Sequence, residues 1–170
     1  MENLQGQYVM YKNRGICKVT EVKRASFAGL EEREYYVLNS VYDRHLQMLV
    51  PADREPEEVG MRRVLSREEI DLAIEKADPG SIEWDPDIKV RYAYFTEILQ
   101  SGDRIGILSL IMCLYDKKAE MESVKKKLYA KDSQALSLAE HTIREEFAFV
   151  LGIDKLKVSE YIMEKANIAG

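Results

Sequence analysis

The side chains best suited to catalysis or metal binding are few in this chain of 170 residues, and they lack the spacing that such chemistry needs. His45 and His141, the two histidines, have no cysteine or carboxylate at a metal-ligand spacing. Cys17 and Cys113 lie far apart among apolar neighbours, which favours buried free thiols over a disulfide. The chain has neither a glycine-rich phosphate loop nor a serine in a Gly-x-Ser-x-Gly elbow. We therefore expect no enzyme, no metal and no cofactor.

One aromatic residue and a group of lysines are the most distinctive side chains of the sequence. Trp84, the only tryptophan, directly precedes Asp85, a predicted N-cap, and Pro86, which suits the first position of a helix. A tryptophan there is either presented to a partner or buried at a seam between domains. Residues 84–131 hold nine basic against seven acidic side chains in a chain of net charge -5. The densest cluster comprises Lys117, Lys118, Lys125, Lys126, Lys127 and Lys131, for which a solvated helix face is the alternative.

The composition is that of an ordinary soluble protein. With 46% hydrophobic residues, the chain can form one domain or two small ones. No stretch is long and apolar enough for a membrane span, and residues 1–5 lack the pattern of a signal peptide. These observations predict a cytoplasmic location, and the acidic total argues against a protein coated by nucleic acid.

The elements that must position these residues begin with a β-patterned segment. Short apolar runs separated by turn or charge signals are typical of strands. They cover residues 8–11, 16–22, 34–39 and 47–50, with turn candidates at 13–15 and 28–30. A broad open sheet of so few short strands would have exposed edges and no covered core. We therefore expect a small SH3-like or Tudor-like β-barrel.

The pattern becomes helical after residue 64. Ser66 and Glu69 have the spacing of a capping box for a helix that ends near Lys76. Further helices are predicted from Pro86 to about 101, from about 104, from about 132 to 151 and from about 154 to 166. The predicted fold class is therefore α+β, with a β module at 1–60, a helical bundle at 61–170 and a linker near 52–65.

Several local sequences follow one another along these elements in a recognisable order. Gly6-Gln7-Tyr8-Val9-Met10-Tyr11 opens the first strand, and Tyr35-Tyr36-Val37-Leu38, Met48-Leu49-Val50-Pro51 and Gly60-Met61-Arg62 follow. In the helical part, Arg91-Tyr92 leads to Ser101-Gly102-Asp103 and then to Glu145-Glu146-Phe147-Ala148. No single piece is specific, but their joint order resembles the CarD-like family. These are bacterial transcription regulators whose N-terminal module is shared with the transcription-repair coupling factor.

The resemblance implies a division of labour between the two modules. The β module would dock on the β subunit of RNA polymerase, and we assign its surface to Lys23, Arg24, Gln47 and Leu49. The helical module would contact promoter DNA at the upstream edge of the transcription bubble and stabilise the open complex. Its tryptophan would wedge into the minor groove, and recognition would depend on DNA shape rather than on base sequence. We assign the DNA contacts to Trp84, Lys89, Arg91, Lys117, Lys118 and Lys125, in a protein expected to be a monomer.

The chain departs from the family where these contacts are expected. Trp84 precedes Tyr92 by eight residues, whereas the family spacing is about four, and four helical residues correspond to about 6 Å. Ala93 and Leu49 stand where the family has basic residues. A second hypothesis is therefore a divergent module that docks on RNA polymerase, or on another protein, without acting on DNA. A third is an enzyme whose site is assembled from distant residues.

Overall fold

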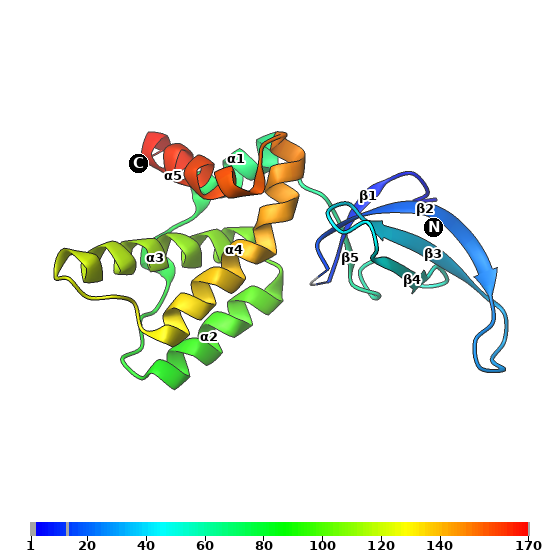
Figure 1. Ribbon diagram of the computed structural model, residues 1–170, viewed down its shortest axis with the longest axis horizontal. Coiled ribbons are helices and arrows are strands. Elements are labelled where there is room, and N and C mark those ends of the chain that lie inside the picture. The colour runs from blue at the N-terminus through cyan, green and yellow to red at the C-terminus, as the bar shows by residue number, and fades with distance from the viewer. Residues whose placement is uncertain (1–2, 13, 170) are drawn as a thin grey trace. The chain divides into compact units, whose positions relative to one another are not determined.

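The chain folds into two compact units of the α+β class. The computed structural model describes residues 3–12 and 14–169, and it divides the chain into a sheet unit, Met1–Leu65, and a helical unit, Ser66–Gly170 (Figure 1). The division expected after residue 60 falls after Leu65, because Met61–Arg63 form a strand that belongs to the sheet. The predicted linker therefore contains part of the first unit.

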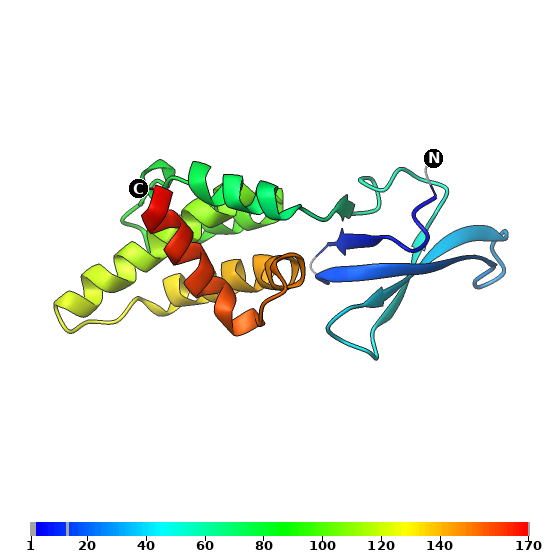
Figure 2. The same cartoon turned by 90° about the horizontal axis from the view of Figure 1, so that it is seen from above.

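The sheet unit is one antiparallel sheet in the order β4-β3-β2-β1-β5 (Figure 2). Its strands are β1 (Tyr8–Tyr11), β2 (Ile16–Ala25), β3 (Arg33–Ser40), β4 (Gln47–Pro51) and β5 (Met61–Arg63). The four predicted strands are confirmed, and the sequence missed β5, because three residues are too few to show a period of two. Among the described residues, the edge strands β4 and β5 do not pair with one another. The sheet is therefore open, and the predicted barrel is not confirmed.

Alternation of side chains gives the sheet its core. Buried residues on successive strands form one cluster, which comprises Val9, Cys17, Val19, Tyr36, Leu38, Val50, Ala52 and Met61. Ala28 and Gly29 have positive φ angles of 52° and 75° in the connection between β2 and β3, where a turn is predicted. The other predicted turn includes Asn13, which lies outside the described residues. Cys17 and Cys113 are buried free thiols, as predicted.

The helical unit contains five α-helices and two 3-10 turns in the described part of the chain. Its elements are α1 (Arg67–Lys76), η1 (Pro79–Ser81), α2 (Ile88–Ser101), α3 (Arg104–Ser123), α4 (Ala130–Leu151), η2 (Lys155–Lys157) and α5 (Val158–Ala169). Helices α2, α3 and α4 pack against one another, and α1 packs on α3 and α5 (Figures 1 and 2). In the described residues, no helix combines the length and the apolar character needed to cross a membrane.

Short-range capping signals set most of the helix ends. Ser66 accepts a hydrogen bond from the Glu69 N–H at the start of α1, as predicted. Gly102, in the left-handed conformation, ends α2, and Asp103 caps α3. Gly152 ends α4 in the same way as Gly102 ends α2.

The start of α2 corrects a prediction. The helix begins at Ile88 and not at Pro86, because the Asp87 carboxylate accepts hydrogen bonds from the N–H groups of Lys89 and Val90. Asp85 instead accepts from the Asp87 N–H, which closes a turn ahead of the cap. Trp84 therefore lies in an irregular segment, residues 82–87, and not at the helix entry itself.

Helix α3 supplies the centre of the helical core. All residues from Ile107 to Leu114 are buried, and the polar half of the helix follows. Ser109 is the polar residue in this stretch. Its hydroxyl donates to the Ile105 carbonyl and accepts from the Asp78 N–H, so it fastens the turn before η1 to the core.

Candidate functional site

Trp84 lies half-buried against two cations and one aromatic ring. The Arg91 Cζ atom is 4.3 Å and the Lys117 Nζ atom 5.0 Å from the centroid of the Trp84 ring. The Phe95 ring, at the centre of α2, lies at 5.8 Å with a tilt of 49°. Trp84 is thus neither freely presented nor sealed in a core, which were the two alternatives that the sequence left open. Part of the indole faces the protein, and the rest is accessible to a partner.

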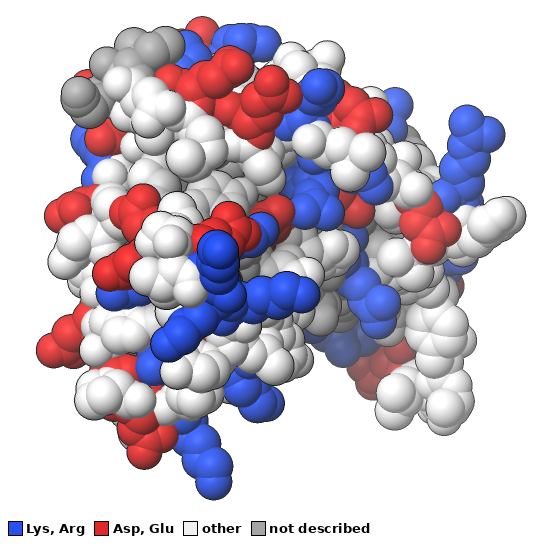
Figure 3. Space-filling model, turned by 60° about the vertical axis from the view of Figure 1, so that its left-hand side comes forward, with Lys and Arg blue, Asp and Glu red and all other residues white. Residues whose placement is uncertain are grey.

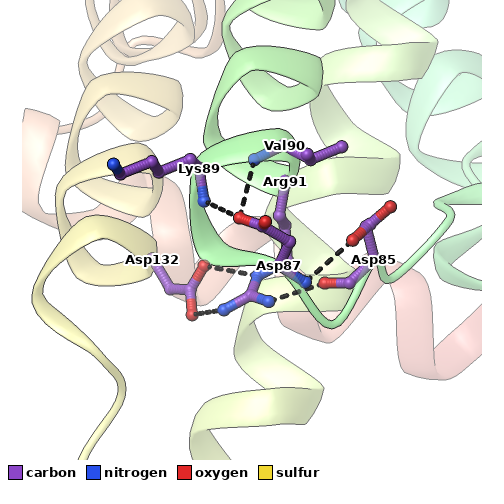
Figure 4. Close-up of polar contacts among 6 residues, drawn as sticks. All are labelled: Asp85, Asp87, Lys89, Val90, Arg91 and Asp132. Carbon is purple, nitrogen blue, oxygen red and sulfur yellow. Dashed lines mark hydrogen bonds and ion pairs between the residues drawn. The ribbon is translucent and has the colours of Figure 1, made fainter.

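Arg91 is buried and carries an ion pair beneath Trp84. Its Nε and Nη2 atoms donate to the two carboxylate oxygens of Asp132 at 2.9 and 2.7 Å, and both side chains are only 2% exposed. Its Nη1 atom donates to the Asp85 carbonyl at 2.7 Å, as Figure 4 shows. The hydrogen bonds to Asp132 raise the pKa of Arg91, so the guanidinium stays charged. The sequence assigned Arg91 to DNA, but the structure turns its donors into the protein.

The local sequence explains why Arg91 reaches these partners. Because Asp87 caps α2, Arg91 lies in the first turn of the helix, next to the chain that leads into it. The Asp85 turn exposes a carbonyl toward that first turn (Figure 4). Asp132 lies in the first turn of α4, which packs along α2. We call Trp84, Phe95, Arg91, Asp132 and Lys117 the Trp84 cluster.

Lys117 is the accessible cation of the Trp84 cluster. Its side chain is partly exposed on α3, and its Nζ atom is 3.3 Å from a carboxylate oxygen of Glu120, one turn further along the helix. A cation over an indole ring contributes roughly 0.5–2 kcal/mol, depending on how far it is desolvated. The ammonium group therefore lies beside the ring while it remains in reach of solvent.

Lys131 and Tyr92 form another cation–π pair in the helical unit, which the sequence did not predict. The Lys131 Nζ atom is 4.6 Å from the centroid of the Tyr92 ring, so it joins the first turn of α4 to α2 next to the Arg91–Asp132 pair. Tyr129, which precedes α4, is 57% exposed. The lysine cluster in the sequence includes Lys131, but nothing in the sequence pairs it with Tyr92.

Lys89, Lys118 and Lys125, the remaining residues assigned to DNA, are exposed and lie outside the Trp84 cluster. Lys89 is on the first turn of α2, Lys118 is on α3, and Lys125 follows the end of α3. Figure 3 shows Lys and Arg side chains that project from the near face of the helical unit, with Asp and Glu side chains around them. The structure thus brings together Trp84, Arg91 and Lys117, and leaves the other three as separate surface charges.

The residues assigned to polymerase divide between the two faces of the sheet. Residues opposite one another on antiparallel strands share a face, and neighbours along a strand alternate. Lys23 pairs with Tyr35, Leu49 with Val37, and Gln47 with Asn39, so Lys23, Leu49 and Gln47 lie on one face. We call this the Lys23 face. Arg24 pairs with Glu34 and projects from the opposite face, so it does not join the other three residues.

Apolar and polar groups lie side by side on the Lys23 face. The Phe27 ring, 46% exposed, stands edge-on to Tyr35 with the centroids 5.4 Å apart. At the other end, Gln47 donates to Asn39, which donates to the Thr20 hydroxyl. An accessible aromatic residue is typical of a protein-binding surface.

The comparisons with known proteins concern the sheet unit. Residues 5–65 match the family model described as the CarD-like/TRCF RID domain. No curated protein matches the chain. The match covers all five strands, including the two that contribute Lys23, Gln47 and Leu49, and it ends where the helical unit begins. Residues 5–65 of the sheet unit are therefore a CarD-like/TRCF RID domain, which is an RNA polymerase-interacting module of transcription.

Proposed function

We propose that this protein is a transcription regulator that binds the β subunit of RNA polymerase and contacts promoter DNA at the upstream edge of the bubble. The match over residues 5–65 supports the polymerase half of this proposal. One observation carries the DNA half: a single tryptophan, half-buried, is held beside an accessible lysine on the helical unit. The effect on transcription would be a longer lifetime of the open complex.

The Trp84 cluster has the properties that a minor-groove wedge requires. A wedge unstacks a base step, which costs on the order of a few kcal/mol, and contacts with the distorted DNA offset this cost. Trp84 supplies the apolar surface, and Lys117 supplies a positive charge beside it for a phosphate. Lys89, Lys118 and Lys125 are exposed and are available for further phosphates. Arg91 supports the ring from inside instead of contacting DNA.

The eight-residue spacing between Trp84 and Tyr92 is compatible with this role. Because residues 82–87 are irregular, the four additional residues do not add a helical turn between the ring and α2. The Trp84 ring instead lies over Arg91, which directly precedes Tyr92. The additional residues are thus accommodated in the segment ahead of the helix.

A promoter assay with RNA polymerase from the same organism tests the proposed contact with DNA. Trp84→Ala should co-purify with polymerase as the unchanged chain does, and it should shorten the half-life of open complexes challenged with a competitor. The reason is that the variant loses the wedge but keeps the Lys23 face. An unchanged half-life at a promoter that responds to the unchanged protein would contradict the wedge.

The polymerase half has a matched pair of variants on β2. Lys23→Glu reverses a charge on the Lys23 face, whereas Arg24→Glu makes the same change on the opposite face. Co-purification with the β subunit should decrease for Lys23→Glu and persist for Arg24→Glu. Equal losses for both variants would argue against the Lys23 face as the docking surface.

A second candidate function is docking on polymerase, or on another protein, without action on DNA. The net charge of -5 favours this second function. The two cations beside Trp84 also favour it, because Arg91 is paired with Asp132 and Lys117 with Glu120. Salt dependence separates the two functions, because phosphate contacts release counterions and make affinity fall with salt. Negligible, salt-insensitive effects on promoter complexes alongside normal polymerase binding would favour this second function.

In this function the protein is a binding protein and not an enzyme. It acts as a monomer in the cytoplasm, where RNA polymerase is located. Sedimentation of the free protein should give the mass of one chain, 19.6 kDa. A concentration-dependent dimer in the micromolar range would contradict the monomer.

A further inference from the structure

We infer that Arg91, fixed by Asp132, is a positioning residue that holds the Trp84 ring in its half-buried orientation. The placement of the ring is a property of the free protein. Its consequence for promoter DNA rests on the proposed function.

Arg91 is fixed by Asp132 and reaches Trp84 through two contacts. The guanidinium forms two hydrogen bonds with Asp132 on α4, which fixes its plane. A third donor holds the Asp85 carbonyl, directly after Trp84 in the chain. The guanidinium carbon also lies 4.3 Å from the centroid of the ring. Arg91 thus fixes both the backbone next to the tryptophan and the surface on which its ring rests.

The chemistry of the contact requires an arginine. A guanidinium is planar, donates in two directions to a carboxylate and stacks on an aromatic face. A lysine at position 91 would keep the positive charge, but it cannot bind both Asp132 oxygens and the Asp85 carbonyl with the same geometry. Arg91→Lys therefore removes the positioning without removing the charge.

Apart from Arg91, few contacts fix the orientation of the Trp84 ring in segment 82–87. The segment is irregular, so no helical or strand ladder orients the indole. Phe95 contacts the ring from α2, and Lys117 reaches it with a flexible side chain. The hydrogen bond from Arg91 is the one that ties the backbone beside Trp84 to the fixed guanidinium.

The unit contains a matched control for this inference. Arg104, at the start of α3, donates through Nε and Nη2 to the two oxygens of Glu146 at 3.2 and 2.8 Å. This pair also joins a helix start to α4 and is mostly buried, at 15% and 0% exposed. It lies outside the Trp84 cluster, so it reports the general effect of disturbing a buried ion pair.

The experiment uses the intrinsic fluorescence of the full chain, because Trp84 is its only tryptophan. Arg91→Lys and Asp132→Asn are compared with Arg104→Lys and Glu146→Gln, each at a temperature at which circular dichroism shows a folded chain. Emission maximum, acrylamide quenching and anisotropy report the accessibility and mobility of the indole. The first two variants should shift the emission to the red and raise the population of displaced rings roughly fivefold. The reason is that the guanidinium under the ring is replaced in one variant and released from Asp132 in the other, which weakens the fixed cation–π contact. Glu146→Gln and Arg104→Lys should leave the emission unchanged.

A double variant covers the case in which a single change at the buried pair prevents folding. Replacement of a buried ion pair by apolar residues is often tolerated, because no unpaired charge remains. Arg91→Met with Asp132→Leu should therefore fold and still show the red shift and the higher quenching. Unchanged Trp84 emission and quenching in a folded Arg91→Lys or double variant would overturn the inference.

The promoter assay separates this inference from the proposed function. If Trp84→Ala shortens the open-complex half-life, Arg91→Lys should shorten it in the same direction, with polymerase binding unchanged. If Trp84→Ala has no effect, the wedge is wrong, and the fluorescence of the free protein still decides whether Arg91 positions the ring. A normal half-life for Arg91→Lys beside a short one for Trp84→Ala would overturn the positioning role at the promoter.

Discussion

Two arginines near the starts of neighbouring helices reach carboxylates on α4, yet their surroundings differ. Arg104 pairs with Glu146 through the same two nitrogens that Arg91 uses for Asp132. The Arg91 guanidinium lies under the Trp84 ring, and its third nitrogen donates to the Asp85 carbonyl of the loop before α2. The Arg104–Glu146 pair therefore contributes to the packing of α3 on α4. The Arg91–Asp132 pair contributes to the packing of α2 on α4 and also to the placement of Trp84. The buried Arg91 charge therefore matters for function because the Trp84 ring rests on it.

The sheet unit offers a third pair of the same chemistry in a different environment. Arg33 donates through two nitrogens to Asp53, but both side chains are at least 40% exposed. Water already solvates these charges, so their attraction is screened. Burial, and not the identity of the partners, separates this exposed pair from the two pairs of the helical unit.

The largest expected effect comes from removal of a buried carboxylate. Asp132→Ala leaves the buried Arg91 charge without its carboxylate, so the free energy of unfolding should fall by about 3–5 kcal/mol. Glu146→Ala should lower it by a similar amount, since Arg104 loses the same kind of partner. Chemical denaturation followed by circular dichroism measures both values. A loss below about 1 kcal/mol for Asp132→Ala would show that water reaches Arg91, and the comparison would then fail.

The hydrogen bond between the Tyr161 phenol and the Asp71 carboxylate should make the free energy of unfolding depend on pH, with a smaller effect than the loss of Asp132. Burial, together with the hydrogen bond to Asp71, raises the pKa of Tyr161 to about 12. A raised folded-state pKa adds stability that is fully present below the unfolded pKa, about 10, and is lost as pH rises toward 12. The unchanged chain should therefore lose roughly 2 kcal/mol over this window. The measurement is denaturation at a series of pH values.

Tyr161→Phe is the control for this effect, because it has no phenol to ionise. Its stability should be lower at neutral pH, where the hydrogen bond to Asp71 is missing, and its decline between about pH 10 and 12 should be shallower. Identical pH profiles for the two chains would assign the decline to other groups.

Removal of the cation over Tyr92 should have a still smaller effect. Lys131→Gln removes an exposed cation–π contact and should lower the free energy of unfolding by roughly 0.5–1 kcal/mol. The neighbouring Arg91–Asp132 pair should remain, so Trp84 fluorescence should not change. Lys126→Gln, a substitution of an exposed lysine near the end of α3, is the control for loss of charge alone. Equal losses in the two variants would show that the Tyr92 ring contributes nothing.

The exposed pair of the sheet unit should show the smallest effect. Arg33→Gln should leave the denaturation midpoint unchanged within error, because solvent replaces the contact with Asp53. The hydrogen bond with Arg33 lowers the pKa of Asp53, so any contribution is present above the ordinary pKa of an aspartate and is lost as pH falls through the lowered value. A clear shift of the midpoint at neutral pH would show that exposure is not what separates this pair from the two buried pairs.

Short-range signals explain how much of this molecule could be predicted. The Ser66 cap, the glycine stops at Gly102 and Gly152 and the four longer strands depend on residues within a few positions of one another, and the structure confirms them. The order of the local sequences also indicated a CarD-like domain, which the match over residues 5–65 confirms for the sheet unit. The start of α2 was misplaced because Asp85 and Asp87 are both competent caps, and only the hydrogen bonds distinguish them.

The sequence by itself determined the α+β class, most helix ends and strands, and the presence of one tryptophan near a lysine-rich segment. The tertiary structure alone decided that Arg91 faces inward, that Asp132 is its partner, and that Lys117 reaches the Trp84 ring. Arg91 and Asp132 are 41 residues apart, so no periodic pattern or capping rule links them. Their pairing follows from the packing of α2 on α4, which buries both charges and makes each the necessary partner of the other.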